Sequence, residues 1–149
     1  MKRNKIEKKY EGCPIARVEQ SVPFHDIDSM EVTWHGHYLK YFEIARCKVL
    51  SDIDYDYPQM RSSGYAWPVV DASARYIKPA RYGDQLEIIA VITEWEIQLV
   101  IRYFIYHRDT DILLSKGKTV QVSVSIENSE LQFGSPECLS TRIQKWRNR

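Results

Sequence analysis

One long helix with a single apolar face limits what this chain can fold into. Between about His37 and Ile53, apolar side chains recur at i, i+3, i+4, i+7, i+11 and i+15, namely Tyr38, Tyr41, Phe42, Ala45, Val49 and Ile53. This spacing places them along one side of a helix. The segment 54–58 that follows ends in proline, which disfavours helical backbone in the residue before it and so predicts a stop. A helix of this kind must cover another apolar layer.

Five strand-like runs can supply that layer. One run precedes the helix, and four follow it, separated by short polar turns: 16–25, 66–77, 84–95, 98–107 and 113–126. Short turns between consecutive strands favour antiparallel pairing. Residues 59–64 are expected to form a loop, and residues 137–149 a short C-terminal amphipathic helix. We therefore expect an α+β fold in which a five-stranded antiparallel sheet curls around one long central helix, with open edges that favour self-association.

Length and charge narrow the class of protein. A chain of 149 residues suits a single domain, here residues 1–149, and a net charge of +1 does not indicate a nucleic-acid partner. The basic residues near the N-terminus precede no apolar stretch, so we expect residues 1–15 to be a solvated basic tail rather than a secretory signal. No run approaches the ~20 apolar residues of a membrane span. Three cysteines without metal-ligand spacing fit a reducing, cytoplasmic setting.

The chemistry is concentrated in residues 24–38, between the first strand and the long helix. This stretch holds two aspartates, three histidines and a glutamate. Backbone N–H groups around His35 and Gly36, at the start of the helix, can stabilise a developing oxyanion. A carboxylate opposite them, such as Asp28, can act as nucleophile or as general base for water. These groups suffice for acyl transfer from a thioester.

Each of these residues also has a structural interpretation. An aspartate before a helix is commonly a cap or turn residue. The histidines could suggest a metal site, but the spacing of His35 and His37 with Asp26 and Asp28 nearby is not a recognised ligand pattern. We therefore predict no metal site.

The same stretch resembles the 4-hydroxybenzoyl-CoA thioesterase family and the acyl-CoA thioesterases associated with the Tol-Pal system. The resemblance consists of a D-x-D motif at 26–28, an aromatic segment at 34–38, an F-E-x-A-R motif at 42–46 and a later match at 75–86. It extends from about Val18 to Val124, which is most of the chain. It implies a hotdog fold, dimers or tetramers of dimers, and an active site at the subunit interface.

The resemblance also implies roles for individual residues. Asp28, the second aspartate of D-x-D, would be the catalytic carboxylate. The His35 N–H would polarise the thioester carbonyl, and its imidazole could assist the leaving thiolate or water. Tyr38 would be structural or line the pocket, beside Gly36 and Trp34.

Other positions are assigned more loosely. Lys78 and Arg81 would meet the phosphates of coenzyme A at the pocket mouth, and Glu43 with Arg46 would form an ion pair that positions the helix. Glu31 departs from the family, which often has glycine there. The acyl chain would be bounded by apolar residues, for which the candidates are Met30, Trp34, Tyr65, Trp67 and Val69.

The predicted function is hydrolysis of an acyl-CoA thioester with no metal or organic cofactor. An acyl-carrier-protein thioester is an alternative substrate. A chain of this fold could also bind acyl-CoA without catalysis or act as a scaffold, because fold does not dictate function. The acyl group, aryl or aliphatic, is left open.

Overall fold

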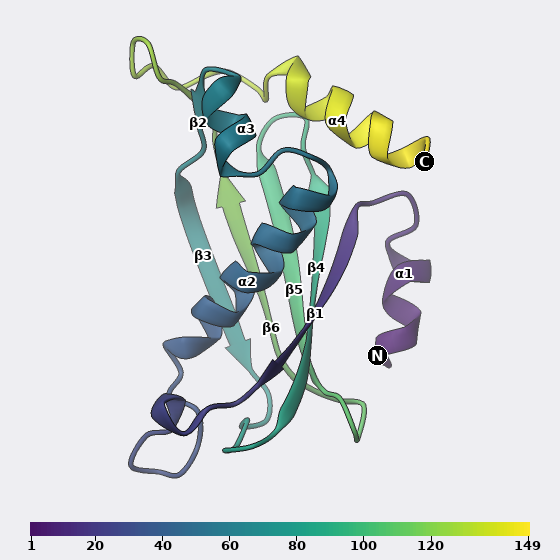
Figure 1. Cartoon of the computed structure of the whole chain (residues 1–149), viewed down its shortest axis with the longest axis vertical. Coiled ribbons are helices and arrows are strands. Elements are labelled where there is room, and N and C mark those ends of the chain that lie inside the picture. Colours follow the sequence, from purple (N-terminus) through teal and green to yellow (C-terminus); the bar gives the residue numbers. More distant parts are fainter.

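A long helix lies across one face of a twisted sheet in the computed structural model, which describes all residues 1–149 (Figure 1). The helix is α2 (His37–Asp52). The sheet has the order β1-β4-β5-β6-β3, and all neighbouring strands are antiparallel. Its strands are β1 (Ile15–Ser21), β3 (Val69–Tyr76), β4 (Gln85–Glu94), β5 (Leu99–His107) and β6 (Ile112–Gln121). The predicted α+β architecture, with five antiparallel strands around one helix, is confirmed.

The core lies between α2 and the sheet. All six apolar side chains that define the helix face in the sequence are buried. On β5, alternate residues face α2, and the ring of Phe42 stacks on Tyr103 with centroids 4.7 Å apart. Gly117 of β6 makes room for this pair, because a Cβ there would overlap the Phe42 ring. A glycine inside a strand here marks the close approach of a helix side chain.

Residues 57–62 form helix α3 (Tyr57–Ser62), so the loop predicted over 59–64 is wrong. The Asp56 carboxylate accepts from the Tyr57 N–H at 2.7 Å, and the Gln59 side chain accepts from the Asp56 N–H at 3.1 Å. Pro58 lies in the first turn, where its missing N–H costs no helical hydrogen bond. The proline expected to mark the end of the long helix therefore lies at the start of the next helix, six residues after α2 ends at Asp52.

The ends of three predicted strands differ from the structure. β1 ends at Ser21 because a 3-10 turn, η2 (Phe24–Asp26), follows Pro23. Pro68 separates β3 from a short strand β2 (Tyr65–Ala66), which pairs with β7 (Val124–Ser125) in a small second sheet. Proline has no N–H to donate to a strand ladder, which explains the interruption. The C-terminal helix is confirmed as α4 (Glu137–Arg147), with Leu139 and Ile143 buried.

The N-terminal segment is ordered against the sheet, so the solvated tail predicted for residues 1–15 is wrong. It contains η1 (Arg3–Lys5), α1 (Ile6–Lys9) and the start of β1. Ile6 is fully buried among side chains on the sheet face away from α2, which are Ile89, Val91, Phe104 and Tyr106. Arg3 pairs with Glu87 at 3.0 Å and with Asp111 at 3.2 Å. The segment docks because β4 and β5 are apolar on both faces and need cover on each.

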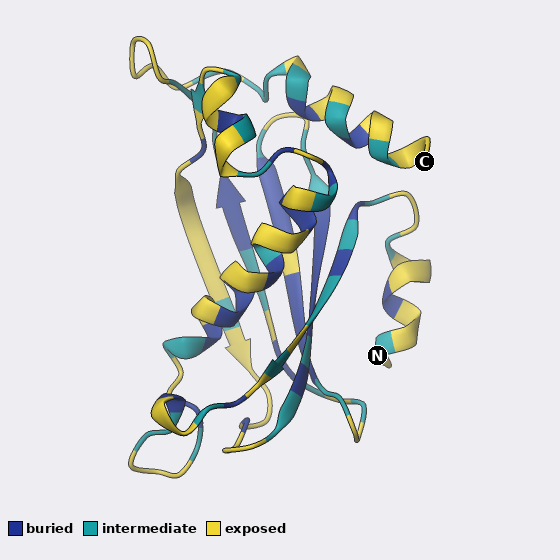
Figure 2. Ribbon diagram, viewed as in Figure 1, coloured by how far each residue is buried: buried dark blue, intermediate teal, exposed yellow.

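The opposite edge of the sheet is uncovered. Seven of the eight residues of β3 are exposed, and only Ala74 is partly buried. Figure 2 shows β3 as an exposed strand beside the buried centre of the sheet. No helix is long and apolar enough to cross a membrane, and the three cysteines are free.

Candidate active site

Backbone hydrogen bonds near its two ends hold the loop between β1 and α2 in place. The Trp34 N–H donates to the Asp26 carbonyl at 2.9 Å, and the Thr33 N–H donates to the Ala80 carbonyl at 2.8 Å. Ile27 and Thr33 form an isolated antiparallel bridge. These bonds fix residues 28–32 as a compact turn and attach the loop to the connection between β3 and β4.

The first aspartate of D-x-D is structural. Asp26 is 1% exposed, and its carboxylate accepts hydrogen bonds from Lys40 Nζ and from the Tyr41 hydroxyl, both at 2.6 Å. Burial raises the pKa of the Asp26 carboxyl, but the bonds from Lys40 and Tyr41 more than offset it and hold this pKa below its usual value. Burial and the Asp26 carboxylate raise the pKa of Tyr41 in turn. Asp26 therefore anchors the loop to α2.

The second aspartate faces a pocket. Asp28 is partly buried, and one carboxylate oxygen accepts from the Met30 N–H at 2.8 Å. Its backbone N–H donates to the Val32 carbonyl at 2.9 Å, and its carbonyl accepts from Glu31 at 3.0 Å. The turn thus orients the carboxylate and leaves its second oxygen without a protein partner. That oxygen is available to a substrate or a water.

Glu31 occupies a left-handed position in this turn, with φ of 63°. Glycine adopts this backbone without the steric cost that a Cβ imposes. The glycine that the resemblance implies at this position would fit this backbone without strain. The Glu31 side chain is exposed and does not line the pocket beside Asp28, so it neither narrows that pocket nor adds a charge to its wall.

The pocket beside Asp28, the Asp28 pocket, has a volume of about 360 Å³. Four of the residues that line it are predicted site residues, namely Asp28, His35, Tyr38 and Lys78. The other six are Met30, Val32, Thr33, Tyr76, Ile77 and Pro79. The loop, the start of α2 and the end of β3 therefore converge on one cavity. Its wall combines a carboxylate, an imidazole and an ammonium group with apolar side chains.

Three predicted site residues lie outside the Asp28 pocket. The Trp34 ring lies over Gly36, where any Cβ would overlap it. This close approach of the ring to the backbone explains the glycine. Arg81 follows the pocket in a turn where its N–H donates to an Asp84 carboxylate oxygen at 2.8 Å, and its side chain is exposed.

Two backbone N–H groups at the start of α2 have no acceptor in the protein. His37 donates to the Trp34 carbonyl at 2.9 Å and Tyr38 to the His35 carbonyl at 3.4 Å, whereas the N–H groups of His35 and Gly36 donate to none. No side chain caps this helix end. Free amides at the positive end of a helix dipole stabilise negative charge.

Two tyrosines brace this helix end. The buried Tyr38 hydroxyl accepts from the Ala80 N–H at 3.1 Å, and burial raises the pKa of Tyr38. Tyr76, which the sequence reasoning missed, donates to the His35 carbonyl at 2.9 Å. This role depends on where β3 lies beside the loop, which the sequence pattern does not show. On the surface of α2, Glu43 and Arg46 form the predicted ion pair.

The acyl-lining candidates are divided between two cavities. Met30 lines the Asp28 pocket, whereas Tyr65 and Trp67 line a second cavity of about 620 Å³ near the C-terminal end of α2 and the start of β3. Val69 is exposed on β3. No group of three or more His, Cys, Asp or Glu side chains is arranged to hold a metal ion.

Comparison with known proteins identifies relatives of this chain. Its sequence matches the thioesterase-like superfamily over residues 22–146. It is 29% identical over 94 residues to YneP of Bacillus subtilis (strain 168), a candidate acyl-CoA thioesterase by name, with 62% of this chain and 68% of YneP covered.

Solved structures share the fold at lower identity. Slr0204 from Synechocystis, described as a 1,4-dihydroxy-2-naphthoyl-CoA thioesterase, has a TM-score of 0.77 at 24% identity and covers 87% of this chain and 96% of its own. SAV2348 from Staphylococcus aureus, solved in complex with CoA, has a TM-score of 0.78 at 15% identity over 90% of this chain and 84% of its own. These likenesses confirm the predicted hotdog fold. Because the family match runs from the end of β1 into α4 and includes the whole candidate site, the chain belongs to the thioesterase-like superfamily.

Proposed function

We propose that this protein hydrolyses an acyl-CoA thioester, with Asp28 as the catalytic carboxylate. One observation carries the proposal: Asp28, with a free carboxylate oxygen, and His35, with a free backbone N–H, line the same cavity, and the free N–H of Gly36 is the next one along the chain. The names of the relatives support CoA thioesters as the substrate class.

In the proposed reaction, the thioester carbonyl oxygen accepts hydrogen bonds from the His35 and Gly36 N–H groups. Asp28 either removes a proton from an attacking water or attacks the carbonyl carbon itself. The carbon–sulfur bond breaks as the tetrahedral oxyanion collapses, and the thiolate leaves. If Asp28 acted as base, the thiolate takes the proton that Asp28 removed from water, and the free acid is the other product. If Asp28 attacked, the product is an acyl–Asp28 anhydride, which water hydrolyses to the free acid and the Asp28 carboxylate while the thiolate takes a proton from that water. The amides stabilise the charge only as it develops, which lowers the barrier rather than tightening substrate binding. Lys78, at the pocket wall, offers a positive charge to the phosphates of coenzyme A.

We further propose that two copies pair through their β3 strands. An exposed edge strand offers unpaired N–H and C=O groups to a second strand. It carries the exposed apolar side chains of Val69 and Val70 and is followed by exposed Ile77. Pairing two copies of this strand antiparallel would build one continuous sheet with both α2 helices on the same face.

Such pairing would also combine the two cavities. Within one protomer, the 620 Å³ cavity adjoins the start of β3 and the Asp28 pocket its end. The strand between them spans about 25 Å, since a strand rises about 3.3 Å per residue. Antiparallel pairing sets the end of one strand beside the start of the other. The acyl group would then enter the partner's cavity, which Leu50, Met60 and Trp67 line, while its carbonyl stays beside Asp28.

The test is thiol release from aryl-CoA and from short, medium and long acyl-CoA thioesters. Wild type is compared with Asp28→Asn, which keeps the side-chain shape, and with Asp109→Asn, an exposed hairpin aspartate, as control. We expect Asp28→Asn to lower kcat by about 100-fold or more and the control to stay within two-fold. Wild-type inactivity on every thioester, or an Asp28→Asn enzyme as fast as wild type, would overturn the proposal.

A further inference from the structure

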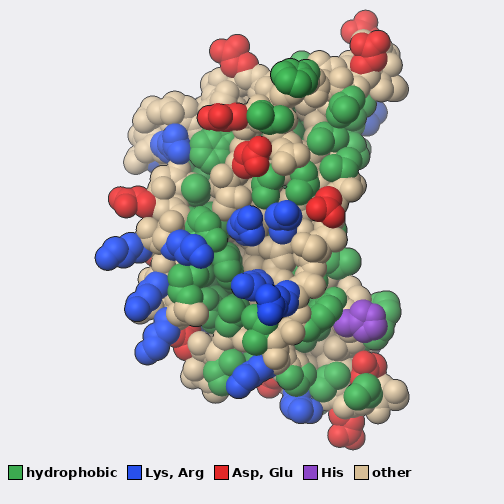
Figure 3. Space-filling view, turned by 180° about the vertical axis from the view of Figure 1, so that it is seen from behind, with side chains coloured by type: hydrophobic (Ala, Val, Ile, Leu, Met, Phe, Trp, Pro, Cys, Tyr) green, Lys and Arg blue, Asp and Glu red, His purple; other side chains and the backbone are tan.

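The sheet face away from α2 carries a basic groove that the proposed hydrolysis does not use. The groove has a volume of about 340 Å³. Five cations line it, namely Lys9, Arg75, Arg102, Lys116 and Lys118, and no carboxylate does. Figure 3 shows Lys and Arg side chains gathered over the middle and one side of this face.

The strand register forces these cations together. Arg75 lies opposite Lys116 on neighbouring strands, and Arg102 lies opposite Lys118. Like charges directly opposite each other on one face of a sheet repel. None of the five takes part in an ion pair within the chain, whereas Arg3 and Arg17 on the same face both pair with Glu87. The Glu87 carboxylate therefore offsets the charges of Arg3 and Arg17, whereas no carboxylate pairs with the five cations of the groove.

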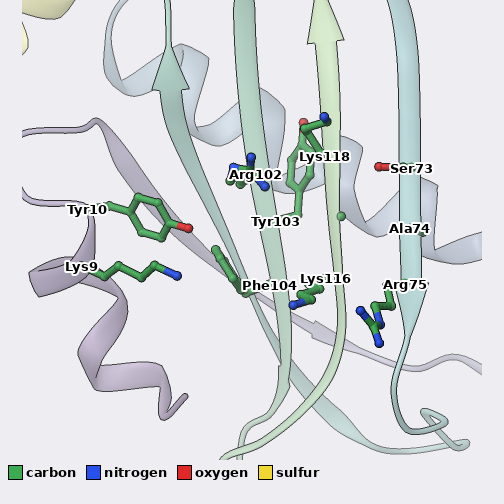
Figure 4. A pocket seen from close by; sticks show the side chains of 11 residues that line it. Lys9, Tyr10, Ser73, Ala74, Arg75, Arg102, Tyr103, Phe104, Lys116 and Lys118 are labelled. Carbon is green, nitrogen blue, oxygen red and sulfur yellow. The ribbon is translucent and has the colours of Figure 1, made fainter.

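The N-terminal segment gives this basic surface a wall. Tyr10 packs against Phe104 with ring centroids 6.0 Å apart, and Lys9 Nζ lies 5.4 Å from the centre of the Tyr10 ring. In Figure 4 the side chains of Lys9, Lys116 and Arg75 come from three different elements and extend toward the space between them. The result is a concave site with donors on opposite sides.

We propose that this groove binds a compact polyphosphate anion, such as the diphosphate of a nucleotide. Several cations with no partner, two of them planar guanidinium forks, match a ligand with several charged oxygens. A long nucleic acid fits less well, because the chain has a net charge of only +1 and the groove, with a volume of about 340 Å³, is small. A membrane surface fits less well too, since no exposed apolar side chain accompanies these cations.

The phosphates could belong to a free nucleotide or to the nucleotide part of the acyl-CoA substrate. Arg75 and Tyr76 are consecutive in β3, so they point to opposite faces of the sheet. Arg75 lines the groove, and Tyr76 lines the Asp28 pocket. The groove and the proposed catalytic pocket are thus back to back across one strand, and the shared ligand chemistry is phosphate.

The binding test is calorimetric titration of the full chain with ADP and with pyrophosphate. The variant Lys116→Gln/Lys118→Gln removes two groove cations and keeps their stems. Lys145→Gln/Arg149→Gln removes two exposed cations of the C-terminal region and is the matched control. We expect the groove variant to bind at least ten-fold more weakly and the control to bind within two-fold of wild type. Absence of binding, or equal weakening in both variants, would overturn the inference, as would binding of a single-stranded oligonucleotide but of neither small probe.

Steady-state kinetics distinguishes the two sources of the phosphates, a free nucleotide and the nucleotide part of the substrate. If the groove holds the nucleotide of the substrate, Lys116→Gln/Lys118→Gln raises KM for an acyl-CoA and leaves KM for the matching acyl-pantetheine unchanged. If it holds a free nucleotide, both KM values stay unchanged while ADP binding is lost. The titration needs no thioesterase activity, so failure of the proposed hydrolysis and failure of this inference give different results.

Discussion

The Tyr76 hydroxyl donates a 2.9 Å hydrogen bond to the His35 carbonyl, which joins the edge strand β3 to the open end of α2. That carbonyl belongs to the peptide whose N–H is that of Gly36, one of the two free donors. A bond to the carbonyl therefore orients a proposed oxyanion donor directly.

We expect Tyr76→Phe to lower kcat by about five- to ten-fold, the equivalent of one lost hydrogen bond, with little change in KM. Steady-state kinetics with the best thioester of the panel measures both constants. Tyr82→Phe, which removes a hydroxyl from an exposed tyrosine outside the pocket, is the control and should behave as wild type. An effect confined to KM would mean that Tyr76 only contacts the substrate.

Glu31→Gly should stabilise the protein by about 1 kcal/mol, because glycine relieves the left-handed strain at this position. The free energy of unfolding in urea measures the change. Glu31→Ala removes the same charge but keeps a Cβ, so it should not stabilise. If the two variants are equally stable, the charge of Glu31 rather than its backbone explains the result.

Asp26→Asn should destabilise the fold by about 2 kcal/mol at pH 7, since it weakens the bonds from Lys40 and Tyr41 to a buried carboxylate. The pKa of Asp26 is lowered on folding, so its contribution is fully present above the pKa of the unfolded chain. It is lost as the pH falls through the folded-state pKa. Urea unfolding at pH 7 and at successively lower pH should therefore show the wild type and the variant converging in acid. A constant difference between them would contradict this interpretation.

Val70→Lys should convert a dimer into a monomer, because a charged side chain on an edge strand opposes pairing with another strand. Val70 is 59% exposed in the single chain, so the substitution costs the protomer little. Sedimentation velocity measures the association state, and thiol release should fall with it if both protomers build the site. Ile97→Lys, at a similarly exposed hairpin position, is the control. A wild type that sediments as a monomer would exclude pairing through β3.

The helix, the strands and the position of Asp28 could be predicted because each is a local pattern. The periodicity of α2 and the D-x-D motif need no knowledge of distant contacts. Lys78 and Arg81 look equivalent in sequence, but the turn after Pro79 carries Arg81 away from the Asp28 pocket. Only the path of the chain in the structure shows that Lys78 lines the pocket and Arg81 does not.

The N-terminal segment and the role of Tyr76 could not be predicted because both depend on contacts between distant segments. Ile6 looks like a lone apolar residue in a basic tail until the outward side chains of β4 and β5 provide its pocket. Tyr76 reaches His35 only because of how β3 lies beside the loop. Helix α3 was missed for a different reason, since Pro58 fits both a helix stop and a first helical turn.

The docking of Ile6 has a consequence for the order of folding. Its pocket consists of residues 89–106, from two strands that must pair before the pocket exists. The segment before β1 is attached by this side chain, by the Tyr10 ring, by ion pairs of Arg3 and Glu7 and by a few hydrogen bonds, so its release requires no unfolding of the sheet. The residues before β1 are therefore among the last to reach their native position, although they precede the sheet in the chain, and they should be the first to exchange their amide protons.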